Sequence, residues 1–213
     1  MSTRTLFSTV TRLALGAACM LAATGCGSEM LRTGRSPVFL IVDSVSASAG
    51  GGNTASGSFL LSDVQVLVDV TVNGVSTKVP TIFNDNADVG ISAIAKNQTV
   101  PTTPLNSVTL TRYHVNYRRA DGRNTPGSDV PFAFDGPLST TIPAGGNSQH
   151  VTFILVRHEA KLEPPLSTLV GRGGQGFISA IAEITFYGHD QNGNEVSVSA
   201  NIDVQFGDFG DSQ

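Results

Sequence analysis

The chain has 213 residues, a length that allows one or two domains. Its 17 acidic and 13 basic residues give a formal net charge of −4. This acidic balance argues against a general nucleic-acid-binding protein, which would normally carry a basic patch or stripe.

The first 25 residues differ from the rest of the chain. Arg4 and Arg12 precede an apolar run at residues 13–23, and small residues follow that run. The run is too short to cross a membrane as a mature helix, so residues 1–25 are predicted to be a secretory signal. The 188 residues that remain after cleavage carry 11 basic and 17 acidic side chains, a formal charge of −6.

The end of this signal carries a short motif. The segment Leu21-Ala22-Ala23-Thr24-Gly25-Cys26 resembles the lipobox of bacterial lipoproteins, in which cleavage before the cysteine is coupled to its acylation. The resemblance covers only the N-terminus, and Ala23 stands where Leu is commoner. It implies acyl chains on Cys26, which would anchor the protein stably, and retention at the outer membrane because Gly27 follows the cysteine rather than Asp. The alternative is ordinary signal cleavage nearby, which would leave a soluble protein with a free thiol.

The two cysteines have predicted fates that leave none for other chemistry. Cys19 lies inside the apolar part of the signal and Cys26 is the predicted anchor. The mature chain would then have no cysteine pair for a disulfide and no thiol for a metal site or a nucleophile. Its stability must come from the core, and 188 residues are enough to bury most of the apolar surface.

The mature chain begins with a polar segment. Residues 26–36 show no periodicity and are predicted to form a lipidated tether. Pro37 opens a continuous apolar run at residues 38–42, which predicts the first strand. Residues 46–58 are rich in Gly, Ser and Ala and are predicted to form a flexible loop.

A hairpin is predicted next. Residues 59–61 begin a strand, and valines then occupy every second position from 64 to 72. Asn73-Gly74 is a strong signal for a two-residue turn, and the chain returns through residues 75–79. Residues 84–88 are predicted to form a loop, 89–94 a strand and 98–106 a connection.

The strand predicted at residues 108–117 has a change of phase. Val108 and Leu110 are even-numbered, whereas Tyr113, Val115 and Tyr117 are odd-numbered. A β-bulge near residues 111–112 would re-aim the side chains in this way. The alternative is a strand with both faces partly covered.

The middle of the chain is predicted to be a series of short elements. Residues 118–127 form a hairpin tip, and residues 132–134 and 138–142 form short strands. Residues 149–157 are nearly all apolar, which predicts a central strand. Residues 158–172 leave room for at most one turn of helix.

The last hairpin is the clearest element of the sequence. Apolar residues occupy even positions in both arms, at 178–186 and 196–206, with mostly polar residues between them. Directly opposed residues share a face, so the numbers of each pair must add up to an even number. A three-residue loop at 191–193, a type I turn closed by a glycine bulge, satisfies this condition, whereas a two-residue turn does not. The predicted opposed pairs are Phe186 with Val198 and Ile184 with Ala200.

These elements predict an all-β protein of about eight or nine strands. Two packed antiparallel sheets are the natural arrangement, and the pattern resembles the immunoglobulin and fibronectin type III sandwiches. The resemblance rests on pattern alone, because the chain has no Trp and so lacks the Cys–Trp–Cys core of antibody domains. Residues 37–209 are predicted to form this Ig-like domain and 210–213 a C-terminal tail. Insertions are expected around residues 46–105, with two small β-domains as the alternative.

The motifs that suggest chemistry are incomplete. His158-Glu159 begins like a zinc-protease motif, but Leu162 stands where the second histidine is required, and no Gly-x-Ser-x-Gly elbow is present. The histidines at 114, 150, 158 and 189 share no spacing. The glycine-rich residues 171–176 precede a strand, whereas a phosphate-binding loop opens a helix. The sequence therefore predicts no catalytic residue, metal site or cofactor.

Two groups of oxygen-bearing residues are candidates for calcium loops. They comprise Asp85 with Asp88, and Asp190 with Asn192 and Asn194. Calcium takes six to eight oxygen ligands, and neither group supplies enough carboxylates. The second group is already explained as a turn.

A cluster of basic residues is the candidate partner surface. Four of the 11 mature basic residues fall within 12 positions. They are Arg112, Arg118, Arg119 and Arg123. They are predicted to be a solvated hairpin tip, with an anionic or acidic partner as the sharper hypothesis. Tyr113 and Tyr117 are predicted to lie at the edge of the core rather than to form a sugar-stacking platform.

The function predicted from these observations is non-enzymatic. The chain is expected to be a lipid-anchored protein of the bacterial cell envelope that binds a partner protein or glycan, or serves as a structural or assembly accessory. The alternatives are a carbohydrate- or calcium-dependent binding module and an envelope hydrolase whose acid and base come from separate loops.

Overall fold

The computed structural model of the protein describes residues 34–51 and 56–209, and this part of the chain is all-β. The strands are β1(Val38–Ser48), β2(Phe59–Asp63), β3(Val66–Val72), β4(Val75–Thr81), β5(Asp85–Ala95), β6(Val108–Arg118), β7(Phe134–Ile142), β8(Gln149–Val156), β9(Phe177–Asp190) and β10(Glu195–Gly207). The helices described are short: η1(Pro104–Asn106), α3(His158–Leu162) and η2(Leu166–Leu169). The predicted signal, Cys26, most of the tether and the tail at 210–213 lie outside the described residues.

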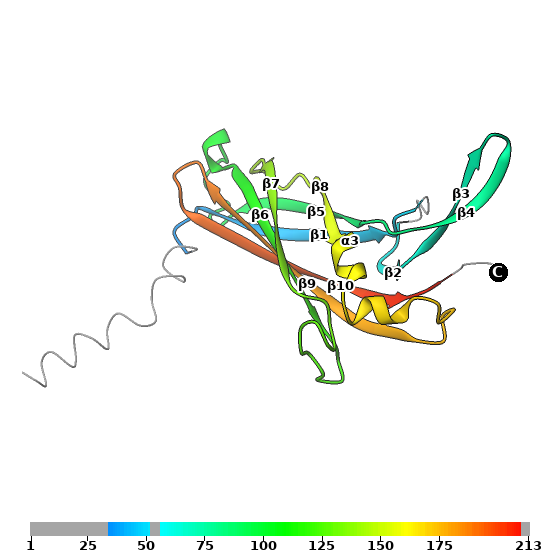
Figure 1. The fold of residues 1–213 in the computed structure, drawn as a ribbon. Helices are drawn as coiled ribbons and strands as arrows, with labels where there is room; N and C mark the ends of the chain where they lie inside the picture. The colour runs from blue at the N-terminus through cyan, green and yellow to red at the C-terminus, as the bar shows by residue number, and fades with distance from the viewer. Residues whose placement is uncertain (1–33, 52–55, 210–213) are drawn as a thin grey trace, which may run out of the picture.

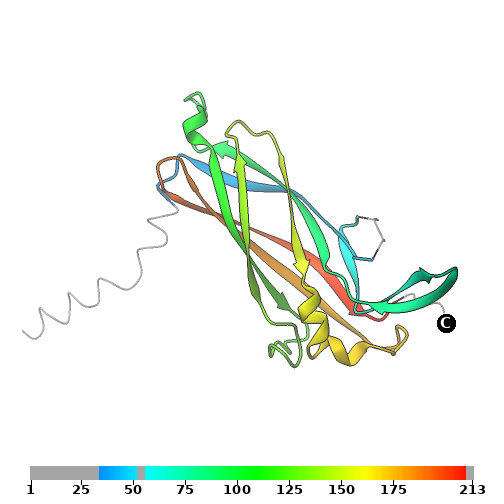
Figure 2. The same cartoon turned by 45° about the horizontal axis from the view of Figure 1, so that its top comes forward.

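Two sheets pack against each other in a β-sandwich-like body (Figures 1 and 2). One has five strands in the order β2-β10-β9-β6-β7, and the other has three in the order β1-β5-β8. The core lies between them. There the rings of Phe153 and Phe186 pack edge to face with their centroids 5.2 Å apart, and the centroid of the Tyr113 ring lies 5.0 Å from that of Phe153. We call these two sheets the body.

The predicted register of the last hairpin is confirmed. Phe186 opposes Val198 and Ile184 opposes Ala200 in the β9–β10 pair. The Asp190 N–H donates to the Asn194 carbonyl at 2.9 Å, and the Gly193 N–H donates to the Asp190 carbonyl at 3.0 Å. Gly193 has a φ of 79°, so the turn is the predicted three-residue loop closed by a left-handed glycine.

The predicted bulge in the strand after residue 108 is also confirmed. The register of β6 shifts between Leu110 and Arg112 against both of its neighbours, β7 and β9. Thr111 is the exposed extra residue, and Leu110 and Tyr113 on its two sides are both buried. The bulge therefore keeps apolar side chains in the core although the parity of the sequence changes.

Several sequence predictions are wrong in detail. The described residues contain ten strands rather than eight or nine, and residues 134–142 form one strand, β7. β2 pairs in parallel with β10, so the sheets are not purely antiparallel. The segment 158–172 holds α3 and the 3-10 helix η2 rather than a single turn.

Two errors have a clear physical reason. The apolar run at 149–157 was predicted to be a central strand, but β8 lies at the edge of its sheet. Its core-facing side chains Val151, Phe153 and Leu155 are nevertheless buried, and β8 also contacts β7 of the other layer. Residues 84–88 were predicted to form a loop, yet β5 begins at Asp85, whose buried carboxylate is bonded by groups from three other segments.

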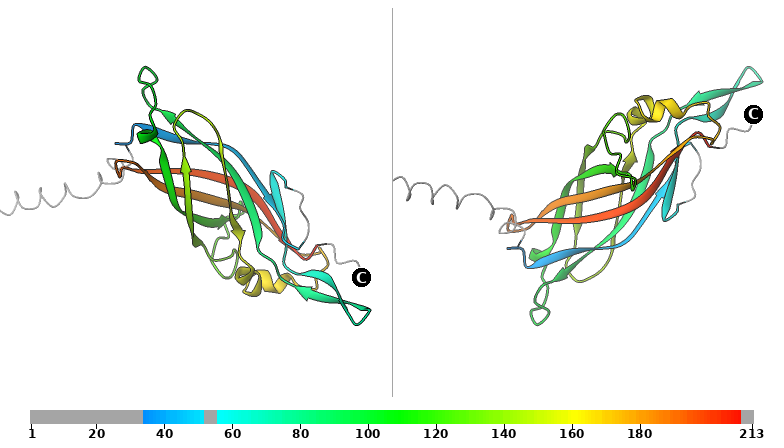
Figure 3. Two further views of the ribbon diagram at one scale, coloured as in Figure 1. Left: turned by 90° about the horizontal axis from the view of Figure 1, so that it is seen from above. Right: turned by 90° about the horizontal axis from the view of Figure 1, so that it is seen from below.

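The hairpin β3–β4 projects from the body as a two-stranded ribbon (Figure 3). Its two-residue turn is confirmed, since Val72 opposes Val75 and both Asn73 and Gly74 have positive φ values, of 52° and 82°. The ribbon is inserted between β2 and β5, within the region where insertions were expected.

The body has two distinct ends. At the end that we call the tether end, the start of β1 lies beside the end of β5 and near the turn of the β9–β10 hairpin, and the Ser36 hydroxyl bonds the Asp190 carboxylate (Figure 1). Ser36, assigned to the tether, is therefore packed on the body and buried. The opposite end, which we call the distal end, carries the ribbon and the described segments 49–51, 56–58, 119–133 and 157–176. Residues 52–55 of the predicted flexible loop lie outside the described part.

Candidate functional site

The outer face of the five-stranded sheet carries two of the four candidate arginines. Past the bulge, even-numbered residues of β6 point away from the core, because successive side chains of a strand alternate between its faces. Arg112 Nη1 lies 3.1 Å from Asp135 Oδ1, and its guanidinium lies 3.7 Å from the centre of the Tyr187 ring. His114 Nδ1 contacts the same carboxylate at 3.3 Å.

A second polar group follows on the same face. Arg118 Nη2 lies 2.7 Å from Glu183 Oε1, and the Asn116 amide donates to Glu183 Oε2 at 3.3 Å. Glu183 belongs to β9 and the two donors belong to β6. The outer face of β6 and β9 is thus a row of cross-strand polar pairs, which we call the polar row.

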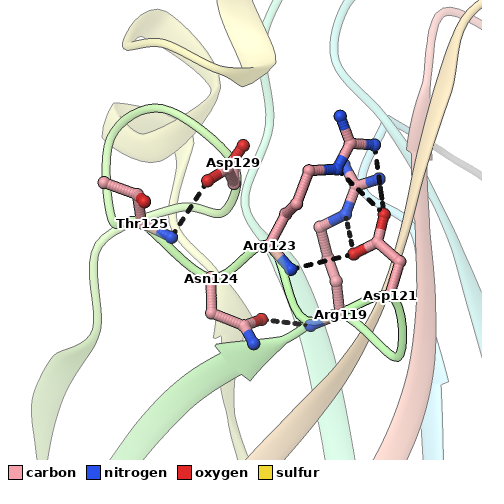
Figure 4. A network of polar contacts seen from close by, with 6 residues as sticks. All are labelled: Arg119, Asp121, Arg123, Asn124, Thr125 and Asp129. Atoms are coloured by element: carbon pink, nitrogen blue, oxygen red, sulfur yellow. Dashed lines mark hydrogen bonds and ion pairs between the residues drawn. The ribbon is translucent and has the colours of Figure 1, made fainter.

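The other two arginines lie in the loop that follows β6 (Figure 4). Asp121 accepts from Arg119 Nη2 at 2.6 Å and from Arg123 Nε at 3.1 Å. The hydrogen bond from Arg119, aided by the N–H and side chain of Arg123, holds the pKa of Asp121 well below its usual value, and the same bond raises the pKa of Arg119. Asn124 Oδ1 accepts the Arg119 backbone N–H at 2.7 Å, which closes the loop.

The four arginines therefore do not form one cationic patch. Arg112 and Arg118 are six residues apart on one strand, a separation of about 20 Å. Each of the four guanidiniums contacts a carboxylate, of Asp135, Glu183 or Asp121. Water and salt screen surface ion pairs, so these contacts order the surface more than they stabilise the fold.

The two tyrosines are buried more deeply than predicted. Tyr113 and Tyr117 belong to the core, and the Tyr117 hydroxyl donates to the Leu155 carbonyl at 2.6 Å. Burial raises the pKa of Tyr117 far above its ordinary value. Neither ring is placed to stack on a sugar.

The histidines and oxygen-rich segments have separate local partners. His150 contacts Asp88, His158 contacts Glu159 and the His189 ring contacts the Asp190 carbonyl. Across residues 34–51 and 56–209, no three His, Cys, Asp or Glu side chains lie close enough together to hold a metal ion.

The Asp190 carboxylate is used inside its own turn. It is buried and accepts the backbone N–H groups of Asn192 and Asn194, each at 2.9 Å, and the Asn194 side-chain amide. Burial alone would raise the pKa of Asp190, but these hydrogen bonds and the Ser36 hydroxyl outweigh it and lower the pKa. The group predicted to be a turn rather than a calcium loop has that structural role.

A buried ion pair at the distal end was not predicted from the sequence. Lys161 Nζ of α3 lies 2.8 Å from Asp85 Oδ1 of β5, and the two side chains are 1% and 0% exposed. Asp85 Oδ1 also accepts the Gly50 N–H at 2.9 Å, and Oδ2 accepts the Ser62 hydroxyl at 2.6 Å. No sequence pattern links two residues 76 positions apart, and Asp85 had been assigned to a loop.

This cluster closes the neck of the ribbon. Ser62 lies in β2, before the ribbon, and Asp85 begins β5, after it. Their hydrogen bond therefore joins the two points at which the ribbon leaves and re-enters the body, and Lys161 secures α3 to the same place.

The ribbon presents an apolar face that the described residues cover only at its base. Every second residue of β3 is a valine, and Val75 and Val79 of β4 lie on the same face. Val66 and Val68 near the neck are half-buried, whereas Val72 and Val75 at the tip are 61% and 66% exposed. An uncovered apolar face on a projecting hairpin is typical of a contact surface.

Comparison of the chain with known proteins finds no match to a family model, to a curated protein or to a solved structure. Among the described residues no helix is both long and apolar enough to cross a membrane.

Proposed function

We propose that this chain is a non-enzymatic, lipid-anchored protein of the bacterial cell envelope with an Ig-like β-sandwich, and that it serves as a binding or assembly module. The observation that supports this proposal is the grouping of the three longest excursions of the described chain at one end. The ribbon and the segments 119–133 and 157–176 all leave the distal end of the body.

The strand order supports the Ig-like part of the proposal. With β1, β5 and β8 as strands A, B and E, and β6, β9 and β10 as C, F and G, the layers have the ABE and CFG grouping of immunoglobulin domains. β7 then takes the place of C′ beside C. The ribbon is an insertion before strand B in this assignment.

The position of the anchor supports the binding role. Gly34 is the eighth residue after Cys26, so the segment between them spans at most about 30 Å when fully extended. The 14 residues of β9 extend over about 45 Å, so the tether is shorter than the body. Acyl chains on Cys26 would hold the tether end near the membrane and leave the distal end free to meet a partner. Gly27 after the cysteine favours the outer membrane as the location.

Lipidation has a direct test. Replacing Cys26 by Ala should move the protein from the membrane fraction to the soluble fraction of fractionated cells. A Cys26→Ala variant that remains membrane-bound to the same extent would contradict the anchor.

The binding surface is tested by proximity labelling in native envelopes with the acylated protein. Val75→Asp at the distal end should remove the specific labelled proteins, whereas Leu105→Asp should not. Leu105 is a matched control because it lies at the tether end and is 67% exposed, close to the value for Val75. Loss of labelling in the Leu105 variant alone would place the binding surface at the tether end and contradict the proposal.

Glycan binding is a second candidate, supported by the polar row. Its Arg, Asn and Glu side chains have the donors and acceptors that sugar hydroxyl groups require. Asn116→Ala should weaken retention on peptidoglycan or lipopolysaccharide columns, while Thr109→Ala on the same strand should not. Equal elution of the wild type from a blank column would count against a glycan ligand.

A further inference from the structure

Lys161 and Asp85 form a buried ion pair, and their amine and carboxylate are also close enough to react with each other. The amine nitrogen and a carboxylate oxygen are 2.8 Å apart, and the side chains are removed from solvent. The carboxylate is also polarised from both sides, by the Gly50 N–H on Oδ1 and the Ser62 hydroxyl on Oδ2. The proposed binding function makes no use of this cluster.

We propose that Lys161 and Asp85 condense to an intramolecular isopeptide bond. One proton moves from the Lys161 ammonium to the Asp85 carboxylate, and the neutral amine then attacks Cγ. A C–N bond forms and a C–O bond breaks, and the oxygen leaves as water with the two protons that the nitrogen gives up. The reaction joins an ammonium and a carboxylate into an amide and one water molecule, so no oxidant, cofactor or other reactant is required.

The buried site removes the reason why this reaction fails in water. Two free ions are well solvated in water, which opposes their condensation, whereas the Lys161 and Asp85 side chains are buried and lack that hydration. The fold also holds the two groups in contact, which replaces a bimolecular encounter by an effectively unimolecular step. The Gly50 N–H and the Ser62 hydroxyl are positioned to stabilise negative charge that develops on the carboxyl oxygens.

The bond would have a structural purpose at this place. It would join β5 to α3 across 76 residues and would fix the neck of the ribbon covalently. The mature chain is predicted to have no cysteine pair, so this amide would be the covalent cross-link of a protein that functions outside the cytoplasm.

Intact-mass measurement of the mature wild-type chain tests the proposal. Its mass should be lower by one water molecule than the mass calculated for the cleaved sequence with the acyl chains that it carries, and protease digestion should yield a branched peptide that contains both Asp85 and Lys161. Lys161→Arg keeps the positive charge but cannot form the amide under these conditions, so its mass should equal the value calculated in the same way. Lys96→Arg, at an exposed lysine of the tether end, should keep the deficit.

A cyclic imide at an Asp-Gly sequence also loses one water and must be distinguished. Asp121-Gly122 and Asp135-Gly136 are such sequences. An imide is opened by hydroxylamine and persists in the Lys161→Arg variant, whereas the isopeptide survives hydroxylamine and is absent from that variant. A wild-type chain of full sequence mass, or a deficit that maps to an Asp-Gly sequence, would overturn the proposal. This result does not depend on whether any variant folds.

Discussion

The hairpins β9–β10 and β3–β4 are both amphipathic, yet they have opposite surroundings. The apolar face of β9–β10 lies under the three-stranded sheet, and Ile184, Phe186 and Val204 on it have no exposed surface. The apolar face of β3–β4 extends beyond the body, and Val72 and Val75 remain mostly exposed. Alternation of apolar and polar residues therefore predicts a strand with one apolar face, but it does not predict that this protein covers the face itself.

The turns of the two hairpins differ for a reason that the sequence contains. The apolar residues of β3 are even-numbered and Val75 and Val79 of β4 are odd-numbered, so a two-residue turn aligns them. Both arms of β9–β10 are even-numbered, so an odd-numbered loop is needed. Parity fixes the turn in each case, because directly opposed residues must lie on the same face.

The largest expected difference between the hairpins is in the cost of losing an apolar side chain. Phe186→Ala should lower the free energy of unfolding by about 3–5 kcal/mol, because it leaves a cavity among packed rings. Val75→Ala should change it by less than about 0.5 kcal/mol. Urea unfolding followed by circular dichroism measures both values. A large cost for Val75→Ala would mean that another molecule covers the ribbon.

The second-largest difference between the hairpins is expected in the stability cost of replacing their turn glycines. A Cβ at Gly193 or at Gly74 meets no atom within 4 Å, so the cost arises from the left-handed backbone, with φ values of 79° and 82°. Gly193→Ala should destabilise the whole protein by about 1–2 kcal/mol. Gly74→Ala should leave global stability unchanged and should speed amide hydrogen exchange only in the ribbon. Equal global effects would show that the ribbon unfolds together with the body.

The pH dependence of stability should depend on the β9–β10 turn. The pKa of Asp190 is lowered in the folded protein, so its stabilising effect is present above the unfolded value of 3.8 and is lost as the pH falls through the folded pKa. Asp190→Asn should therefore reduce the acid sensitivity of unfolding, by at most about 1.4 kcal/mol per pH unit. Chemical unfolding of both proteins from neutral pH downward checks this. Parallel curves would assign the acid sensitivity to other carboxyl groups.

The smallest expected effect is on the ribbon surface. The double variant Val72→Thr and Val75→Thr should change the stability by no more than about 0.5 kcal/mol, because both side chains are exposed. It should reduce the binding of a hydrophobic dye to the native protein. Unchanged dye binding would place the exposed apolar surface elsewhere, for example at Phe59 or Phe177, which are both more than half exposed.

Much of the fold was predictable because alternation and turn chemistry act over a few residues. The bulge at Thr111 was one of two alternatives raised by the change of parity, and the pairing of Phe186 with Val198 followed from parity together with the three-residue turn. The position of β8 at the edge of its sheet could not be predicted, because an apolar run indicates that a strand is buried but not which element buries it. Asp85 was misassigned because aspartate disfavours strands unless distant groups bond it.

The candidate site was less predictable than the fold. In the sequence Arg112, Arg118, Arg119 and Arg123 form one group. The sequence could not show that Arg112 and Arg118 lie far apart along β6, or that carboxylates of β7 and β9 form ion pairs with them. The contact of Lys161 with Asp85 depends on how α3 folds back over the end of β5, which no local pattern encodes.

The sequence by itself determined much of the local conformation of this protein: the positions of most strands, the apolar faces of the two hairpins, and how these hairpins turn. These properties depend on neighbours within a few positions. Only the tertiary structure decided that β2 pairs in parallel with β10, that Lys161 meets Asp85 at a buried site, and that Val72 and Val75 at the tip of the ribbon are exposed. Those outcomes depend on contacts between residues far apart in the chain, which exist only once both layers of the body have formed.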